Sequence, residues 1–237
     1  SLYKLPKLSK GIVEYTVNEM EANGYSFNKK PSGNTMKYAM TLQNVIDLYH
    51  HRGVPKYRDR FHEAFCIYVS SLKGGGTKTV STASLAHGLR AHPHLLYEDL
   101  RILVIDFDPQ ASLTMFMSHE LSIGLVAETA AQAMLQNVSR EELLSDFVVQ
   151  SVVPGVDIIP ASIDDAFMAE RWKELCNEYL PGQNIHAVLK ENIIDKLKHD
   201  YDFIFVDCGP HLDAFLKNGI AAADLLLAPL PPAGVEV

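Results

Sequence analysis

Seven consecutive residues have the composition of a phosphate-binding loop: Lys73-Gly74-Gly75-Gly76-Thr77-Lys78-Thr79. Glycine lets successive backbone N–H groups turn toward one anion, because no Cβ obstructs the turn. A complete site also needs a lysine amine near the β- and γ-phosphates and a hydroxyl for Mg2+, and Lys78 and Thr79 supply these groups. The spacing therefore predicts that this segment binds the phosphates of a nucleotide.

The segments on either side of this loop strengthen the interpretation. An apolar run over residues 64–69 predicts a strand before the loop, and residues 78–90 predict a helix after it. A helix that begins directly behind the loop adds about half a positive charge at the phosphates. Three glycines in a row could also form an ordinary flexible loop. That alternative explains neither the strand and helix nor the placement of Lys73 and Lys78.

Three aspartates follow two other apolar runs. Asp106 and Asp108 follow residues 102–105, and Asp207 follows residues 203–206. Because parallel strands end at one edge of their sheet, these carboxylates are expected near the phosphate loop, where they hold Mg2+ directly or through water. An aspartate at a strand end can instead be a simple turn or capping residue. Three of them beside a phosphate loop favour the metal site.

Strands and helices alternate from residue 64 onward. Strands are expected at residues 64–70, 100–107, 156–160, 203–206 and 225–230, and helices at residues 78–92, 162–175, 184–197 and 210–223. This alternation predicts an α/β fold with a mainly parallel sheet flanked by helices. Together with the phosphate loop, it predicts a P-loop NTPase.

Composition sets broader limits. With 237 residues, 47% of them apolar, the chain can bury a sizeable core. It has neither a run of about 20 apolar residues that could span a membrane nor a recognisable signal peptide. Its cysteines are Cys66, Cys176 and Cys208, and this odd, widely spaced set is typical of reduced thiols in a cytosolic protein.

The front of the chain differs in charge from the rest. The net charge is −8, yet residues 1–63 contain ten Lys or Arg against six Asp or Glu. A first helix is predicted by apolar residues at helical spacing, which are Leu8, Ile12, Tyr15 and Met20. Ser9 is expected to cap this helix and Gly24 to end it. A second predicted helix begins after Thr41, carries Leu42, Val45, Ile46 and Tyr49 on one face, and ends at Gly53 and Pro55.

A basic, hairpin-like loop over residues 25–38 separates these two helices. Helix, basic loop and helix is a pattern of winged helix-turn-helix modules, in which lysines contact DNA phosphates. The candidate DNA-binding residues are Ser9, Lys10, Lys29, Lys30 and Lys37. The other interpretation is a small helical cap with a solvated lysine loop. We therefore expect a module at residues 1–53, a charged linker at 54–63 and a nucleotide domain at 64–237.

The phosphate loop departs from the common pattern, because Lys73 stands where most P-loops have glycine. It resembles the deviant Walker A motif, K-G-G-x-x-K-[ST], of the ParA/MinD family of ATPases. The segments I-D-F-D-P-Q at residues 105–110 and V-D-C-G-P at residues 206–210 resemble the other two motifs of ParA. The large ParA proteins of plasmid and prophage partition carry an N-terminal helix-turn-helix region, and residues 8–53 resemble it. Four further segments also resemble these proteins, at residues 84–87, 132–135, 160–165 and 230–232.

The resemblance implies a Mg2+-dependent ATPase that converts ATP to ADP as a sandwich homodimer. Lys78 and the backbone from Gly74 to Val80 would bind the nucleotide, and Lys73 would reach the nucleotide of the partner subunit. Thr79, Asp106 and Asp207 would position Mg2+, and Asp108 would orient the attacking water. A ParB-type centromere-binding protein would stimulate hydrolysis.

The resemblance also implies contacts with DNA in the bacterial cytoplasm, on the nucleoid. ADP would favour operator binding and autorepression by the front module, and ATP would favour partition and non-specific DNA binding. Two other functions fit parts of the pattern: a regulator that uses nucleotide only as a ligand, and a MinD-like positioning ATPase. The latter needs a C-terminal amphipathic helix, which the visible chain lacks, so we expect no membrane contact.

Some positions depart from the family. Gly76 and Thr77 replace the usual Val or Ile and a small residue, and Val80 replaces a second threonine, so a hydroxyl contact to the α-phosphate is lost. We expect slightly weaker nucleotide binding as a result. The absence of an initiator Met and the end at Val237 also lead us to expect further residues at both ends, including those that hold adenine.

Overall fold

A computed structural model describes residues 2–70, 77–118, 121, 128–209 and 214–229. The chain divides into two compact units. The front unit contains residues 1–61 together with 88–100, and the second contains residues 62–87 and 101–237. The predicted domain boundaries at residues 53 and 64 stay a prediction. The sequence analysis assigned residues 88–100 to the nucleotide domain, not to the front unit.

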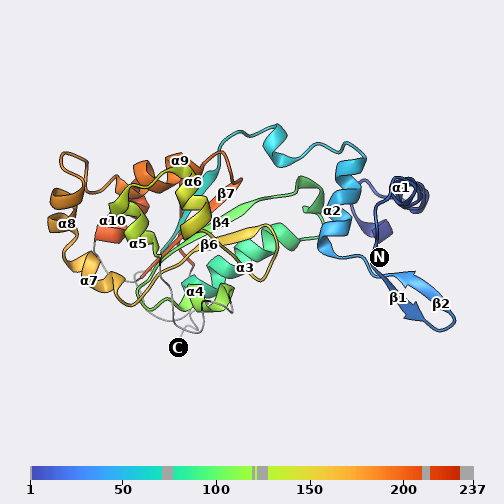
Figure 1. Ribbon diagram of the computed structural model, residues 1–237, viewed down its shortest axis with the longest axis horizontal. Helices are drawn as coiled ribbons and strands as arrows, with labels where there is room; N and C mark the ends of the chain where they lie inside the picture. The colour runs from blue at the N-terminus through green and yellow to red at the C-terminus, as the bar shows by residue number, and fades with distance from the viewer. Residues whose placement is uncertain (1, 71–76, 119–120, 122–127, 210–213, 230–237) are drawn as a thin grey trace, which may run out of the picture. The chain divides into compact units, whose positions relative to one another are not determined.

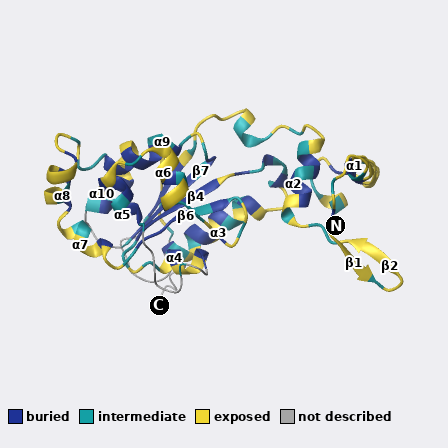
Figure 2. Cartoon of the chain, in the orientation of Figure 1, coloured by how far each residue is buried: buried dark blue, intermediate teal, exposed yellow. Residues whose placement is uncertain are grey.

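The front unit contains two helices with a hairpin between them. Its elements are η1 (Leu2–Lys4), α1 (Lys10–Ala22), β1 (Lys29–Ser32), β2 (Thr35–Tyr38), α2 (Leu42–His51), η2 (Tyr57–Asp59) and η3 (Leu96–Glu98). Strands β1 and β2 pair antiparallel. The hairpin projects away from α1 and α2 (Figure 1), and its residues are mostly exposed (Figure 2).

The ends of these helices follow from local chemistry, as predicted. The Ser9 hydroxyl accepts a hydrogen bond from the Ile12 N–H, and Thr41 forms a reciprocal capping box with Asn44. Gly24 and Gly53 follow the two helices with φ angles of 89° and 64°. Glycine adopts this left-handed conformation without a Cβ penalty, so both helices end there.

The core of the front unit corrects one detail of the sequence analysis. Tyr15, expected on the buried face of α1, is 69% exposed, whereas Val13 and Val17 are buried beside Met20. Leu96 joins the same core although it lies far along the sequence, just before the strand Ile102–Phe107. Residues 88–100 therefore belong to this unit through packing that no local pattern indicates.

The second unit is built on a six-stranded sheet of order β5-β6-β4-β7-β3-β8. Its strands are β3 (Phe65–Val69), β4 (Ile102–Phe107), β5 (Val149–Gln150), β6 (Val156–Ile159), β7 (Phe203–Cys208) and β8 (Leu225–Leu227). The pairs β6–β4, β4–β7, β7–β3 and β3–β8 are parallel, and only the β5–β6 pair is antiparallel. The predicted mainly parallel α/β fold is confirmed.

Helices cover both faces of this sheet. They are α3 (Thr77–Ala91), α4 (Ser112–Met117), α5 (Ala130–Gln136), α6 (Arg140–Glu142), η5 (Leu143–Phe147), α7 (Asp165–Glu170), α8 (Trp172–Tyr179), η6 (Lys190–Ile194), α9 (Asp195–Leu197) and α10 (Ala214–Ala222). Helices α5, α9 and α10 lie on one face, and α3 and α4 lie on the other (Figure 1). Leu103, Ile105 and Phe107 point to the α5 side. Because side chains alternate along a strand, Asp106 points to the α3 side.

Two predicted helices are shorter or more broken than expected. The helix expected over residues 162–175 divides into α7 and α8 at Arg171, and the helix expected over 184–197 becomes the π-helical η6 followed by α9. Side-chain hydrogen bonds contribute to this irregularity. The buried Asn218 Nδ2 and the Trp172 Nε1 both donate to the Ile185 carbonyl, which is therefore held outside a regular helix.

Helix α10 packs closely on β3 at one glycine. A Cβ at Gly219 would lie 2.3 Å from Cε2 of the buried Tyr68 ring, so Gly219→Ala is expected to lower the free energy of unfolding by about 2–3 kcal/mol. Thermal unfolding of the full chain measures this. Gly88→Ala, in α3 with no atom within 4 Å of its Cβ, is the control and should stabilise by about 0.5–1 kcal/mol. Equal stability of the two variants would contradict the close packing.

Candidate active site

Three parallel strands bring the candidate residues to one edge of the sheet. Asp106 in β4 pairs in register with Asp207 in β7, and Asp207 pairs on its other side with Val69, the last residue of β3. Strand β3 thus ends beside Asp207, and α3 begins at Thr77. The register thus places Asp207 between the end of β3 and the Asp106 carboxylate.

Lys78 and Thr79 lie in the first turn of α3. Lys78 is only 8% exposed, and Thr79 is half-buried. Both residues are near enough to Asp207 to lower the pKa of its carboxyl group. A buried lysine ammonium and the N-terminus of a helix of this length both attract anions, so this end of α3 suits a polyphosphate.

The Asp207 carboxylate is buried without ordinary hydrogen bonds. Neither of its oxygens has a partner of normal hydrogen-bond geometry among the described residues, although the Thr79 hydroxyl lies nearby. Burial, together with the charges of Asp106 and Asp108, raises the pKa of Asp207 to about 7. Two unpaired buried carboxylate oxygens beside a threonine hydroxyl match the oxygen ligands that Mg2+ prefers. The donor set at Asp207 therefore fits a hard divalent cation.

Asp106 has a different environment. Its Oδ1 accepts a hydrogen bond from the Asp108 N–H at 3.0 Å, and its Oδ2 accepts two, from the Thr114 N–H at 2.9 Å and the Thr114 hydroxyl at 2.8 Å. Complete burial raises the pKa of Asp106, whereas these hydrogen bonds lower it. Burial has the larger effect, and the pKa is about 7. Its oxygens are committed to the chain after β4, so the geometry favours Asp207 over Asp106 as a direct metal ligand.

Asp108 follows β4 in the sequence, but its side chain lies next to the end of the neighbouring strand β7. A Cβ built on Gly209, two residues after Asp207, would be 3.5 Å from both Cγ and Oδ1 of Asp108. The same Oδ1 accepts a hydrogen bond from the Gln110 N–H. The carboxylate therefore sits beside the end of β7, at van der Waals distance from the position of a Cβ on residue 209.

The structure brings together five of the predicted site residues: Lys78, Thr79, Asp106, Asp108 and Asp207. Lys73, Gly74, Gly75 and Gly76 lie outside the described residues. Thr77 begins α3, and Val80 is 56% exposed. Thr114 was not singled out from the sequence, because only its contact with Asp106 reveals a role. The described part of the chain holds no group of three or more His, Cys, Asp or Glu residues able to bind a metal, and its three cysteines are buried and form no disulfide with one another.

The candidate DNA-binding residues lie on the front unit and differ in availability. Lys29 pairs with Glu21 at 2.8 Å and lies 4.7 Å from the centre of the Tyr38 ring. Lys30 and Lys37 are exposed and directly opposite each other in the hairpin. Like charges in that position destabilise a hairpin, and an anionic ligand would relieve their repulsion. Ser9 and Lys10 are exposed at the start of α1, and Lys10 lies 3.8 Å from Glu14.

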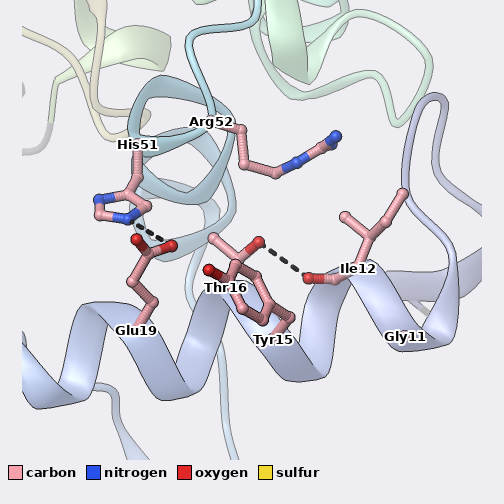
Figure 3. A pocket seen from close by; sticks show the side chains of 7 residues that line it. All are labelled: Gly11, Ile12, Tyr15, Thr16, Glu19, His51 and Arg52. Atoms are coloured by element: carbon pink, nitrogen blue, oxygen red, sulfur yellow. Dashed lines mark hydrogen bonds and ion pairs between the residues drawn. The ribbon is translucent and has the colours of Figure 1, made fainter.

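A pocket of about 440 Å³ also opens in the front unit, between α1 and the end of α2 (Figure 3). His51 Nε2 and a Glu19 carboxylate oxygen lie 3.2 Å apart along its wall, and the exposed Tyr15 and Arg52 line it (Figure 3). The Thr16 hydroxyl is already bonded to the Ile12 carbonyl. The lining of the pocket includes none of the predicted DNA-binding residues, so the pocket does not support the prediction of DNA binding.

The second unit has the fold of a P-loop NTPase, with a mainly parallel sheet, aspartates near the carboxyl ends of β4 and β7, and α3 beside them. The front unit adds a module of helices and a hairpin. Residues 1–61 match the family described as the ParA helix turn helix domain, and residues 64–235 match a family described as an AAA domain. The chain belongs to the ParA family, as its motifs predicted. The prediction of a helix-turn-helix front module is confirmed with it.

Similar proteins agree with this assignment. Plasmid partition protein A of Escherichia coli is 70% identical over 236 residues, which are 100% of this chain and 59% of that protein. A solved partition protein has a TM-score of 0.89 and 56% identity, covering 98% of this chain and 64% of that one. Cobyrinic acid a,c-diamide synthase from Mycobacterium smegmatis, solved with bound ADP and magnesium, has a TM-score of 0.56 and 26% identity over 70% of this chain and 60% of that one.

The chain thus spans 59% of the length of the E. coli relative and 64% of the solved partition protein. A membrane span would require a longer and more apolar helix than any that the structure describes.

Proposed function

We propose that this protein is a Mg2+-dependent ATPase of plasmid partition, which converts ATP and water to ADP and phosphate. One observation carries the proposal: the unpaired Asp207 carboxylate lies at a strand end beside Lys78 and Thr79 of α3. This is the arrangement that phosphoryl transfer needs, because catalysis consists mainly of positioning the phosphates and stabilising their charge.

Each side chain has a distinct task in the proposed reaction. Lys78 and the helix N-terminus bind the β- and γ-phosphates. Thr79 and Asp207 would hold Mg2+, which would supply positive charge to balance that of the phosphates. Asp108 accepts a hydrogen bond from the attacking water. Asp106 does not touch the phosphates in this proposal; it fixes the segment that carries Asp108.

Phosphate release from ATP by the full chain tests the proposal. Turnover is expected with Mg2+ and should fall to background in excess EDTA, because the cation that Thr79 and Asp207 would hold would supply positive charge to the phosphates. Magnesium added back in excess should restore it. Turnover that is equal in Mg2+ and EDTA would exclude the metal-dependent mechanism.

We further propose a nucleotide-bridged homodimer whose hydrolysis is stimulated by a ParB-type centromere-binding partner. The support is the family motif, in which Lys73 replaces a glycine and reaches the nucleotide of the partner subunit. Light scattering of the full chain should show a doubled mass with a slowly hydrolysed ATP analogue. Lys73→Ala should leave ADP affinity unchanged but abolish stimulation by the partner; full stimulation would contradict the role of Lys73.

DNA binding by the front unit is the second proposed activity, with ADP favouring operator binding and ATP favouring partition in the bacterial cytoplasm. Lys30 and Lys37, which lie opposite each other in the hairpin, favour DNA binding by this unit. Replacing both Lys30 and Lys37 with Ala should weaken DNA binding about tenfold and reduce the slope of log K against log salt by about 1–2. Titration of labelled operator DNA at several salt concentrations, with ADP, measures both quantities.

The matched control is the replacement of Lys173 and Lys217, which are exposed on α8 and α10. It changes the net charge equally, so an effect of overall charge alone would appear in both double variants. Equal loss in the two would contradict a specific role of the hairpin.

A further inference from the structure

The segment that carries Asp108 has an unusual attachment to α4. Ala111, at the N-cap position of α4, has a φ of 51° and no side chain that could cap the helix. The Asp106 carboxylate takes that place, since its Oδ2 accepts the N–H of Thr114, the third residue of the helix. A negative charge at a helix N-terminus is favourable. The end of β4 therefore caps α4 and closes residues 106–114 into a loop.

Thr114 holds this loop from two sides. Its hydroxyl donates to Asp106 Oδ2 at 2.8 Å and accepts from the Ala161 N–H at 3.0 Å. The side chain is 1% exposed, so water does not replace either bond. One hydroxyl thus joins the end of β4, helix α4 and the chain just after β6.

The backbone within the loop needs such support. A left-handed conformation is uncommon for a residue with a Cβ, and it persists where the surroundings hold it. Here the Ala111 N–H donates to the Asp108 carbonyl at 2.7 Å, and the Asp108 carboxylate accepts from Gln110. This tight turn sets the direction of the Asp108 side chain toward Gly209.

We propose that Thr114 is a positioning residue for ATP hydrolysis, whose buried hydroxyl clamps residues 106–114 between Asp106 and Ala161 and thereby holds Asp108 at the end of β7. This inference rests on the proposed ATPase function. Both hydrogen bonds of the Thr114 hydroxyl are made within the chain, to Asp106 and Ala161, so in this proposal it acts on turnover rather than on binding. A small displacement of Asp108 is enough to slow the reaction, because a misplacement of about 1 Å can cost about 100-fold.

Thr114→Val tests the clamp in the full chain, because valine keeps the shape of the side chain and removes both hydroxyl bonds. We expect kcat to fall by about tenfold to 100-fold while the Kd for ADP changes by less than about threefold. Thr114→Ser restores the hydroxyl and should keep kcat within about threefold of the wild type. Hydrogen exchange of the Thr114 and Ala161 amides should accelerate in the valine variant and stay slow in the serine variant.

Thr129→Val is the matched control. Thr129 is also buried in the second unit, and its hydroxyl donates to a buried carboxylate, Asp165, at 2.8 Å. It should lose comparable stability yet keep kcat. Wild-type kcat in Thr114→Val, equal loss of kcat in Thr129→Val, or unchanged amide exchange would each overturn the inference. A wild-type chain without ATP turnover would refute the proposed function instead, and exchange would still decide whether Thr114 clamps the loop.

Discussion

Lys78→Met is expected to lower the affinity of the full chain for ADP and ATP by at least about 100-fold, or roughly 3 kcal/mol. Lys78 is buried in the first turn of α3 near Asp207, whose carboxylate also feels the charges of Asp106 and Asp108. Without the Lys78 ammonium group, a bound polyphosphate would lie near three carboxylates, and one buried positive charge that attracts it would be missing. Methionine keeps the length of the side chain, so the loss reports on charge rather than on packing.

Titration with a fluorescent ADP analogue measures this effect. Lys173→Met, on the exposed surface of α8, removes the same charge outside the site and should leave the affinity unchanged. Binding by Lys78→Met within about twofold of the wild type would refute the assignment of α3 as the phosphate-binding helix. Equal weakening in both variants would show a general effect of charge.

The residues of the site were predictable where their position follows from the chain itself. The four apolar residues before Asp207 and those before Asp106 define buried strands, and parallel strands end at one edge. The sequence therefore places both aspartates beside the phosphate loop, and the observed register agrees. Helix caps at Ser9 and Thr41 were equally predictable, because capping depends on residues only three positions apart.

The remaining features depend on contacts between distant segments. The sequence does not distinguish Asp106 from Asp207, since each ends an apolar run; the difference comes from Thr114, which commits the oxygens of Asp106 to hydrogen bonds. Leu96 entered the core of the front unit although it precedes a strand of the other unit. The division of residues 162–179 into α7 and α8 was likewise not visible in the local pattern.

The opposite environments of these two aspartates lead to the second large expected effect. Asp207→Asn should reduce Mg2+-dependent turnover by at least about 100-fold, because an amide is a poor ligand for Mg2+ and leaves the phosphate charge unbalanced. The same change should stabilise the nucleotide-free chain by about 1–2 kcal/mol, since it removes a buried carboxylate that has no partner of normal hydrogen-bond geometry among the described residues and lies near two other carboxylates. Loss of function and gain of stability would then occur in one variant.

Phosphate release and thermal unfolding without nucleotide or metal measure the two effects. Asp165→Asn is the control for stability, because Asp165 is also a buried carboxylate but accepts hydrogen bonds from the Ser162 N–H and the Thr129 hydroxyl. An amide accepts through only one of its two terminal atoms, so this variant should be destabilised by about 1–3 kcal/mol. Destabilisation of both variants would mean that the Asp207 carboxylate is satisfied in the nucleotide-free protein. Undiminished turnover by Asp207→Asn would remove Asp207 from the metal site, and with it the main physical support for an ATPase.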